Sequence, residues 1–399
     1  MTMQTMARTV AAAAVMIGMA AAPAAAACGN GGDFGAWLQA FKQEAVAVGV
    51  SPQVVESALQ GVSYDKSVIS KDRGQKVFSQ TFLEFAGRMV SSNRMQSGAA
   101  QMKKQKALFD RIERDFGVPA PVIVAVWGLE TDFGANTGDM STLRSLATLA
   151  YDCRRPQMFR EELVDALRIV ERGDLSASEM RGAWAGELGQ TQFLATNYLR
   201  YGIDYDGDGR SNLIRSVPDV LGSTANYLAK LGWRPGQPWL REVSIPTDMP
   251  WEQADLSIKH STADWQAAGV RAADGKALPN LPASLFLPMG RNGPAFLSFH
   301  NFDVYLQWNE SLVYATTAAY FATRLSGAGP VGKGNGKVDA LSAAELKTLQ
   351  QGLAARGVNP GPIDGKLGRQ TRTATRTMQM QLGLPADGWP DHALLAALR

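Results

Sequence analysis

The sequence has few of the residues that metal and redox sites need. Its 399 residues include only two cysteines, Cys28 and Cys153, and three histidines, His260, His300 and His392. The histidines are scattered and lack the spacing of a zinc-binding motif. The charge is nearly balanced, at a formal +3, and forms no basic stripe or cluster, so we expect no nucleic-acid partner.

The chain also lacks an apolar run long enough to span a membrane comfortably. The apolar stretch Val10–Ala22 follows Arg8 and precedes the small residues Ala25–Ala27. This order predicts a signal peptide over residues 1–27 that is removed on export. A lipid anchor on Cys28, with outer-membrane association, stays an alternative. We favour export without lipid, because a larger aliphatic residue than Ala25 normally precedes a lipidated cysteine.

An even pair of cysteines in an exported chain predicts a disulfide between Cys28 and Cys153. This bond would hold the mature N-terminus beside the segment that follows Glu130.

The length fits two or three folding units. Hydrophobic periodicity predicts helices from residue 34 to about 230, then short strands between about 235 and 300, and an apolar helix over 311–325. A Gly-rich flexible linker over 326–340 separates this region from a small helical domain at 341–399. The predicted fold is therefore mainly α (α+β), with a small mixed α/β insertion and a three-helix C-terminal domain.

The segment Pro121–Gly134 predicts one helix, since proline stands near its start and glycine at its end. It is apolar on nearly all sides, which predicts burial. Glu130 lies at the end of the apolar run. Burial raises the pKa of a carboxyl group, and a neutral carboxyl can act as a general acid. The alternative is a surface glutamate at a helix end.

A second block, Trp184–Leu194, brings amides, glycines and an aromatic ring together. Gln192 can donate and accept hydrogen bonds as sugar hydroxyls do, and the ring of Phe193 offers a flat apolar face. A tightly packed turn with no ligand is the alternative.

A third block begins at Asp204 and resembles the first half of an EF-hand calcium loop. Aspartates stand at positions one, three and five and glycine at position six. Arg215 replaces the glutamate expected at position twelve, and Asp219 is the candidate substitute. We favour a calcium ion over an ion-free turn because three close carboxylates repel one another. The candidate set is Asp204, Asp206, Asp208, Arg210 and Asp219.

Two further segments allow a simple structural interpretation beside a functional one. Asn309 precedes the apolar helix at 311–325 and would serve as its N-cap. Arg154 and Arg155 form a short basic pair, either in a solvated turn or in contact with an acidic or carbonyl group of a substrate.

Together, and in this order, the blocks GLETDFG, WAGELGQTQF, DYDGDGRSNL and QWNES resemble the lytic murein transglycosylase B family over residues 33–325. The resemblance implies a lysozyme-like helical core, a periplasmic location, a monomer and no required cofactor, with calcium as a structural ion. It implies that Glu130 is the catalytic acid and base. The implied substrate-binding residues are Arg154, Arg155, Gln192, Phe193, Asn309 and Tyr314.

The sequence departs from this family at a few positions. Ala183 stands where some members have serine, and Trp308 where tyrosine can occur. The second half of the calcium loop is also altered.

The C-terminal domain, residues 341–399, resembles a three-helix peptidoglycan-binding domain. Two loops carry the likeness, Ile363–Gly368 and Leu384–Gly388. The alternative is a small helical capping or dimerisation domain.

The family resemblance implies cleavage of peptidoglycan glycan strands between N-acetylmuramic acid and N-acetylglucosamine, with a 1,6-anhydro product. Two other functions stay open. Asp132 or Glu187 would provide the second carboxylate of a lysozyme-like hydrolase. A wall-binding scaffold without catalysis is the other alternative.

Overall fold

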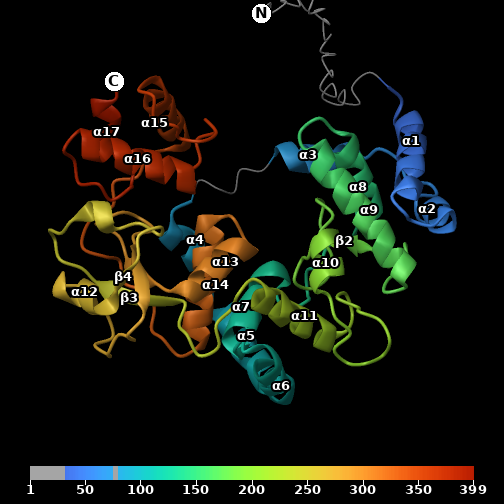
Figure 1. Ribbon diagram of the computed structural model, residues 1–399, viewed down its shortest axis with the longest axis horizontal. Coiled ribbons are helices and arrows are strands. Elements are labelled where there is room, and N and C mark those ends of the chain that lie inside the picture. Colours follow the sequence, from blue (N-terminus) through green and yellow to red (C-terminus); the bar gives the residue numbers. More distant parts are fainter. Residues whose placement is uncertain (1–31, 75–79) are drawn as a thin grey trace, which may run out of the picture.

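The structure is a computed structural model that describes residues 32–74 and 80–399 (Figure 1). The predicted signal peptide, residues 1–27, and Cys28 lie outside the described residues. Within the described ranges, none of the helices combines the length and apolar character that a membrane span requires.

The first two thirds of the chain are mainly helical, as predicted. The helices are α1 (Phe34–Ala47), α2 (Pro52–Ala58), α3 (Lys66–Arg73), α4 (Phe82–Met89), α5 (Ser92–Lys104), α6 (Lys106–Phe116), α7 (Ala120–Thr131), α8 (Thr142–Tyr151), α9 (Pro156–Arg172), α10 (Ala195–Tyr201) and α11 (Val217–Lys230). A small antiparallel pair, β1 (Met140–Ser141) and β2 (Arg181–Gly182), lies among them.

The predicted strand region forms an antiparallel sheet in the order β4-β6-β7-β3-β5. Its elements are β3 (Leu240–Ser244), the short 3-10 helix η2 (Trp251–Gln253), β4 (His260–Ser261), α12 (Thr262–Ala267), β5 (Arg271–Ala272), β6 (Pro282–Phe286) and β7 (Ala295–Ser298). The sheet has its own apolar core around Trp265, Leu285 and Leu297. The predicted mixed insertion is thus confirmed.

Two helices return from the sheet to the main helical body, α13 (His300–Trp308) and α14 (Leu312–Leu325). The apolar helix predicted at 311–325 is therefore confirmed. α14 packs against α7 and α4, and its central residues are buried. Because α7 and α14 are both buried on most sides, they form the centre of the largest apolar core. Figure 1 shows these two helices between the sheet and the N-terminal helices.

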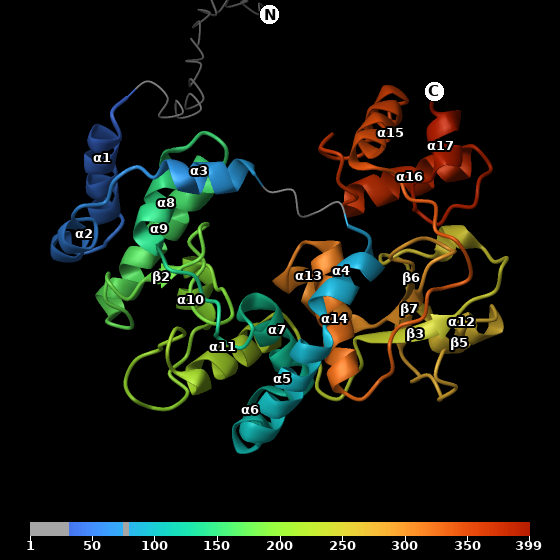
Figure 2. The same cartoon turned by 180° about the vertical axis from the view of Figure 1, so that it is seen from behind.

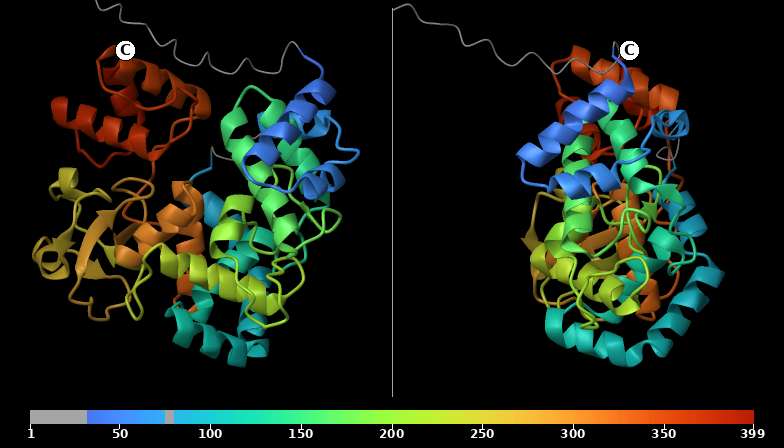
Figure 3. Two further views of the ribbon diagram at one scale, coloured as in Figure 1. Left: turned by 45° about the vertical axis from the view of Figure 1, so that its right-hand side comes forward. Right: turned by 90° about the vertical axis from the view of Figure 1, so that its right-hand side faces the viewer.

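The C-terminal domain consists of α15 (Ala343–Ala355), α16 (Arg369–Gln381) and α17 (His392–Ala397) around a separate small core. Figures 1 and 2 place these three helices beside the sheet, while α1, α2, α8 and α9 lie at the opposite side of the molecule. Figure 3 (left) shows the same separation, with the C-terminal helices in red.

The Gly-rich segment 326–340, the predicted linker, makes contacts with the sheet region. It lies along the sheet region, where the Gly332 N–H donates to Glu242 at 2.7 Å and the Gly336 N–H donates to the Asn292 carbonyl at 3.0 Å. Gly334 has φ +86°, and a Cβ there would lie 2.1 Å from the Gly293 backbone. At Gly334 the absence of a side chain therefore permits close backbone contact, while the flexibility of the segment stays a prediction.

The C-terminal domain is joined to the sheet region by two ion pairs. Asp387, in the predicted binding loop Leu384–Gly388, pairs with Arg291 at 3.0 Å and its side chain is 1% exposed. Arg376 pairs with Asp255 at 3.0 Å. One of the two loops that suggested wall binding thus forms part of a contact within the chain.

Candidate active site

The site is built at the end of α7, whose residues Val122 to Val126 are completely buried. Pro119 is the N-cap of the helix. At the other end Asp132 and Phe133 have φ of 50° and 62°, which stops the helix directly after Glu130 and Thr131. The predicted buried helix with a glutamate at its end is therefore confirmed, and Glu130 is placed in its last turn.

Glu130 keeps some accessible surface, but its carboxyl group lies deep in the protein. Burial raises the pKa of Glu130 to about 8, and the negative charge of Glu187 adds to this effect. A hydrogen bond from the Tyr314 hydroxyl to Glu130 Oε1, at 2.9 Å, opposes the rise. Near pH 7 the carboxyl group is therefore mainly protonated, which suits a general acid.

Tyr314 lies in the first turn of α14 and contacts Glu130 directly. Its ring lies 6.0 Å from Phe85 and 5.8 Å from Trp308, measured between ring centroids. Burial, and then the charge of Glu130, raise the pKa of Tyr314 well above its ordinary value. The hydroxyl therefore stays protonated and acts as a donor.

Asn309 lies at the junction of α13 and α14 but is not the N-cap of α14. That position belongs to Ser311, whose hydroxyl accepts from the Tyr314 N–H. Asn309 Oδ1 accepts instead from the Ser311 N–H at 2.9 Å. Asn309 thus fixes the turn that delivers Tyr314 to Glu130.

Gln190, which sequence reasoning did not select, fixes the loop after β2 to the catalytic helix. Its Oε1 accepts from Trp127 Nε1 at 2.9 Å and its Nε2 donates to the Ile214 carbonyl at 3.0 Å. Thr131 Oγ1 donates to the Gln190 carbonyl at 2.6 Å. In the sequence Gln190 and Gln192 stand in the same block. Nothing in that pattern distinguished the amide that holds the loop from the amide proposed to contact a ligand.

The two residues predicted to bind saccharide have different surroundings. Gln192, with φ 52°, donates from Nε2 to the Gly189 carbonyl at 2.7 Å. The ring of Phe193 is 3% exposed and packs edge-on against Tyr227. A ring so deeply buried has no free face for a sugar. The predicted stacking role of Phe193 is therefore wrong in this structure, and Phe193 is a packing residue.

Arg154 and Arg155 are not a simple solvated turn. Both guanidinium groups pair with Asp72 of α3 at 2.8 Å, and the Asp72 side chain is 1% exposed. A third ion pair links the same two segments with the charges exchanged: Arg73 of α3 pairs with Asp152 at 2.8 Å. The two arginines join α3 to the segment before α9 while remaining partly exposed.

Asp132 and Glu187, the two candidates for the second carboxylate of a hydrolase, differ in their exposure and in their charged partners. Asp132 pairs with Arg94 at 2.6 Å and is 45% exposed, so its charge is already compensated. Glu187 is buried enough that burial raises its pKa, and its charge acts on Glu130.

The acidic loop brings together part of the predicted calcium set. One oxygen each of Asp204, Asp206 and Asp219 lies within 4.8 Å of the others. Asp208 is outside this group, and its carboxylate accepts from the Arg210 N–H at 3.0 Å. The structure thus brings together three members of the predicted set, Asp204, Asp206 and Asp219, while Asp208 and Arg210 are engaged with each other.

Cys153 is not a free thiol, although its predicted partner Cys28 lies outside the described residues. The disulfide between them stays a prediction.

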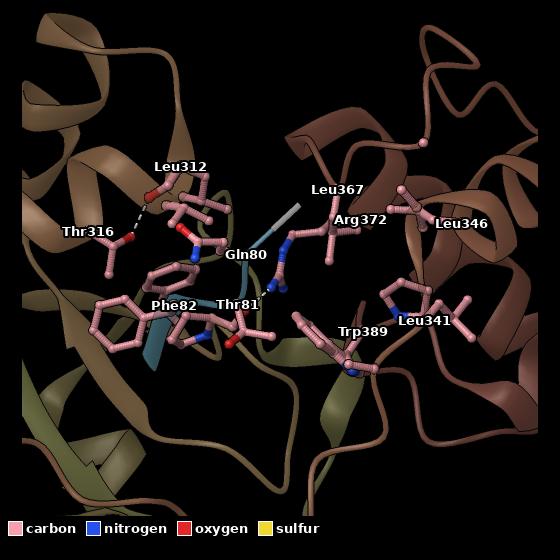
Figure 4. Close-up of a pocket in the computed structure, with 17 residues that line it drawn as sticks. Gln80, Thr81, Phe82, Leu312, Thr316, Leu341, Leu346, Leu367, Arg372 and Trp389 are labelled. Atoms are coloured by element: carbon pink, nitrogen blue, oxygen red, sulfur yellow. Dashed lines mark hydrogen bonds between the residues drawn. The ribbon is translucent and has the colours of Figure 1, made fainter. Parts of the chain in front are cut away.

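A small apolar cavity of about 70 Å³ lies between the C-terminal domain and helices α4 and α14 (Figure 4). Phe82, Leu312 and Thr316 line one side, and Leu367 and Trp389 the other. A neighbouring cavity of about 160 Å³ reaches Tyr314 and is lined by Lys366–Gly368 of the C-terminal domain. The second predicted binding loop therefore lies near the candidate active site.

Comparison with solved structures supports the lysozyme-like helical fold. SltB3 from Pseudomonas aeruginosa, solved in complex with NAG-NAM-pentapeptide, is 40% identical and has a TM-score of 0.86, covering 92% of this chain and 100% of that chain. Slt35 from Escherichia coli, solved in complex with bulgecin A, is 25% identical with a TM-score of 0.63, covering 72% and 92%.

The sequence is also similar to the membrane-bound lytic murein transglycosylase B of Escherichia coli K12. The two are 27% identical over 237 residues, which is 59% of this chain. The match spans 64% of the length of that protein, slightly less than two thirds.

Two family matches cover most of the chain. Residues 342–398 match the family described as "Putative peptidoglycan binding domain". Residues 33–323 match the family described as "Transglycosylase SLT domain". The chain therefore belongs to the SLT-domain lytic transglycosylase family and carries a C-terminal peptidoglycan-binding domain.

Proposed function

We propose that the protein is a periplasmic lytic murein transglycosylase. It cleaves the β-1,4 bond between N-acetylmuramic acid and N-acetylglucosamine and leaves 1,6-anhydro-muramic ends. The observation that carries this proposal is a buried Glu130 with a pKa of about 8 and a tyrosine donor at 2.9 Å. The complexes of SltB3 with NAG-NAM-pentapeptide and with NAG-anhNAM-pentapeptide support the substrate class.

The first step uses Glu130 as an acid. Its proton passes to the glycosidic oxygen, and the bond from that oxygen to the muramic C1 breaks. The leaving N-acetylglucosamine takes the proton and the bonding electron pair, while positive charge develops at C1. Glu130 becomes a carboxylate at this moment. The Tyr314 hydroxyl already points at Oε1, so it stabilises the new charge without rearrangement.

The second step uses the same residue as a base. The Glu130 carboxylate takes the proton of the muramic C6 hydroxyl, and the C6 oxygen bonds to C1. Glu130 is again protonated and the product carries a 1,6-anhydro ring. One carboxyl group serves both steps because they follow one another, which avoids the second carboxylate of a hydrolase.

The surrounding polar side chains support substrate binding. Gln192, Asn309 and the exposed parts of Arg154 and Arg155 are the proposed contacts, since each keeps accessible surface near the elements that hold Glu130. Phe193 contributes by packing the loop that carries Gln192. The C-terminal domain adds affinity for peptidoglycan strands.

We also propose a structural calcium ion at Asp204, Asp206 and Asp219. Three carboxylate oxygens within 4.8 Å of one another are the hard ligands that calcium prefers. Asp219 is completely buried and already accepts from the N–H groups of Tyr205 and Asn212, each at 2.7 Å. Bound calcium would hold the loop and take no part in the reaction. Solved structures of Slt35 include one in complex with calcium, which supports this proposal.

Product analysis tests the function directly. Purified sacculi are digested with the protein, and the soluble muropeptides are identified by mass spectrometry. The variant Glu130→Gln serves as the inactive control. Anhydro-muropeptides without a reducing end are the expected product. Reducing-end muropeptides would replace the proposal with hydrolysis, and binding without soluble product would replace it with a scaffold.

A further inference from the structure

The C-terminal domain contains the same helix–loop–helix unit twice, with α16 shared between the two copies. The first unit runs from α15 to α16 and the second from α16 to α17. Each contains an Asp-Gly pair, at Asp364 and at Asp387, and in both units the next helix begins five residues after the aspartate. We call residues 363–368 the Asp364 loop and residues 386–391 the Asp387 loop.

The Asp364 loop is held by the side chain of Gln350 in α15. Gln350 Oε1 accepts from the Gly365 N–H at 2.8 Å, and its Nε2 donates to the Lys366 carbonyl at 3.1 Å. Asp364 Oδ1 accepts from the Lys366 N–H at 2.9 Å and from Gln350 Nε2 at 3.5 Å. Gln350 is 1% exposed, so the loop is fixed from inside the domain.

The Asp387 loop repeats each of these hydrogen bonds, with Gln379 of α16 in the place of Gln350. Gln379 Oε1 accepts from the Gly388 N–H at 2.9 Å, and its Nε2 donates to the Trp389 carbonyl at 3.0 Å. Asp387 Oδ1 accepts from the Trp389 N–H at 3.0 Å and from Gln379 Nε2 at 3.1 Å. In both loops the aspartate therefore uses Oδ1 within the loop and keeps Oδ2 for another partner.

In the Asp387 loop, the second oxygen binds a peptide segment of the same chain. Asp387 Oδ2 accepts from the Arg291 N–H and from Arg291 Nη1, each at 3.0 Å. Arg372 of the same unit donates to the carbonyls of Leu287 and Pro288. The loop thus holds one cationic residue of a peptide by its main-chain N–H and by its charged side chain.

The matching oxygen of the Asp364 loop has no such segment bound to it in the described ranges. Asp364 is exposed, and its Oδ2 has no hydrogen-bond or ion-pair partner within residues 32–74 and 80–399. Ile363 before it is 42% exposed, whereas its counterpart Ala386 is 5% exposed. The same loop continues into Lys366–Gly368, which line the cavity of about 160 Å³ that reaches Tyr314. A built loop with an open carboxylate oxygen therefore stands beside the candidate active site.

Building on the proposed function, in which the C-terminal domain binds peptidoglycan, we propose that the Asp364 loop binds the stem peptide, the short peptide carried by N-acetylmuramic acid. Asp364 Oδ2 accepts from a main-chain N–H and from the side-chain ammonium group of the peptide's diamino residue. These are the two kinds of donor that Arg291 gives to the matching oxygen of Asp387. One copy of the unit thus joins the domains, and the other meets the substrate.

Titration of the wild-type chain with a synthetic stem peptide tests this proposal without a variant. The probe has its terminal amine acetylated and its side-chain amine free. The amide NMR signals of Gly365 and Lys366 should shift, while those of Gly388 and Trp389 should not, because Asp387 is already occupied. The same peptide acetylated at the side-chain amine should bind at least about threefold more weakly. No shift in the Asp364 loop, equal shifts in both loops, or equal binding of both peptides would overturn the proposal.

Asp364→Asn removes the charge and keeps an oxygen that can accept from the Lys366 N–H, so the loop should stay intact. We expect affinity for the free-amine peptide to fall by roughly threefold to fivefold, the range of an exposed ion pair. Glu345→Gln is the matched control. It removes an exposed charge from the same domain at a capping-box position that glutamine also suits.

Affinity should be unchanged in Glu345→Gln, and equal losses in both variants would reduce the effect to general charge attraction and overturn the proposal. Peptide binding is measured without turnover, so it is decided separately from the proposed function. Absence of anhydro-muropeptides from digested sacculi would reject that function, whereas failure of the peptide to bind the Asp364 loop would reject only this site.

Discussion

Two acidic sites in this molecule show how the surroundings of a carboxyl group decide what it does. Glu130 ends an apolar helix, and burial raises its pKa to about 8. Asp204 is exposed and accepts from three backbone N–H groups, of Gly207, Asp208 and Gly209, which lower its pKa. The first is prepared to give up a proton near neutral pH, and the second to remain an anion that binds a cation.

The two sites also differ in how the chain builds them. The acidic loop draws most of its contacts from residues 204 to 219, so its pattern is visible in the sequence. The site at Glu130 depends on Tyr314, which is 184 positions away. Local sequence therefore predicts an ion-binding loop better than it predicts the contacts of a catalytic acid.

The largest expected effect comes from Glu130→Gln. The amide keeps the size of the side chain but has no acidic proton, so both proposed steps lose their proton carrier. We expect turnover of sacculi to fall by at least about 100-fold, the lower end of what general acid–base catalysis contributes. Circular dichroism and binding to insoluble murein should be unchanged. Retention of wild-type turnover would remove Glu130 from the mechanism.

A smaller loss is expected from Tyr314→Phe. The hydroxyl stabilises the charged form of Glu130, so its removal raises the pKa of Glu130 further. The pH at which kcat/KM falls, as the acid form of Glu130 is lost, should therefore be higher in the variant than in the wild type. Turnover near pH 7 should fall by roughly tenfold, as for loss of one hydrogen bond to a charged group. A shift to lower pH would contradict the assigned contact between Tyr314 and Glu130.

Stability should depend on pH through Glu130. Its pKa is raised on folding, so between about pH 4.5 and 8 the unfolded chain binds fewer protons than the folded one, and stability falls as the pH rises. Glu130→Gln removes this cost. At pH 9 we expect the free energy of unfolding of the variant to exceed that of the wild type by on the order of 1–3 kcal/mol, so the variant melts at a higher temperature. At pH 4 the two should melt at the same temperature. Equal melting at both pH values would show that the carboxyl group is not buried as described.

Periodicity and composition predicted the elements well. The apolar run before Glu130 predicted a buried helix, and the short apolar run Ser284–Leu287 predicted a strand. The contacts between distant elements were beyond such reasoning. The pairing of Arg154 and Arg155 with Asp72 joins segments about 80 residues apart, and no local pattern records it.

Two expectations were limited by what a sequence records. Phe193 was assigned to saccharide binding by resemblance, but an aromatic ring suits a sugar and a core equally well, and here the ring is buried and contacts Tyr227. The segment 326–340 is expected to be flexible because glycine usually permits motion. The sequence did not record that the same lack of side chains lets the backbone at Gly334 and Gly336 lie against Gly293 and Asn292.

The smallest expected effect concerns the acidic loop around Asp204, the second of the two acidic sites compared above. Calcium should raise the melting temperature of the wild type by roughly 5 °C at a concentration well above its dissociation constant, since an ion that binds only the folded state stabilises it. Asp206→Asn should remove this response, because Asp206 belongs to the cluster of three oxygens.

Asp208→Asn is the matched control for the calcium experiment. It removes the same charge two residues away, from a carboxylate engaged with Arg210 and outside the cluster. The calcium response should persist in this variant. If both variants lose it equally, general charge attracts the ion and the geometry of the cluster does not select it. If neither loses it, calcium binds elsewhere, and the contrast between a proton site and a cation site no longer describes this molecule.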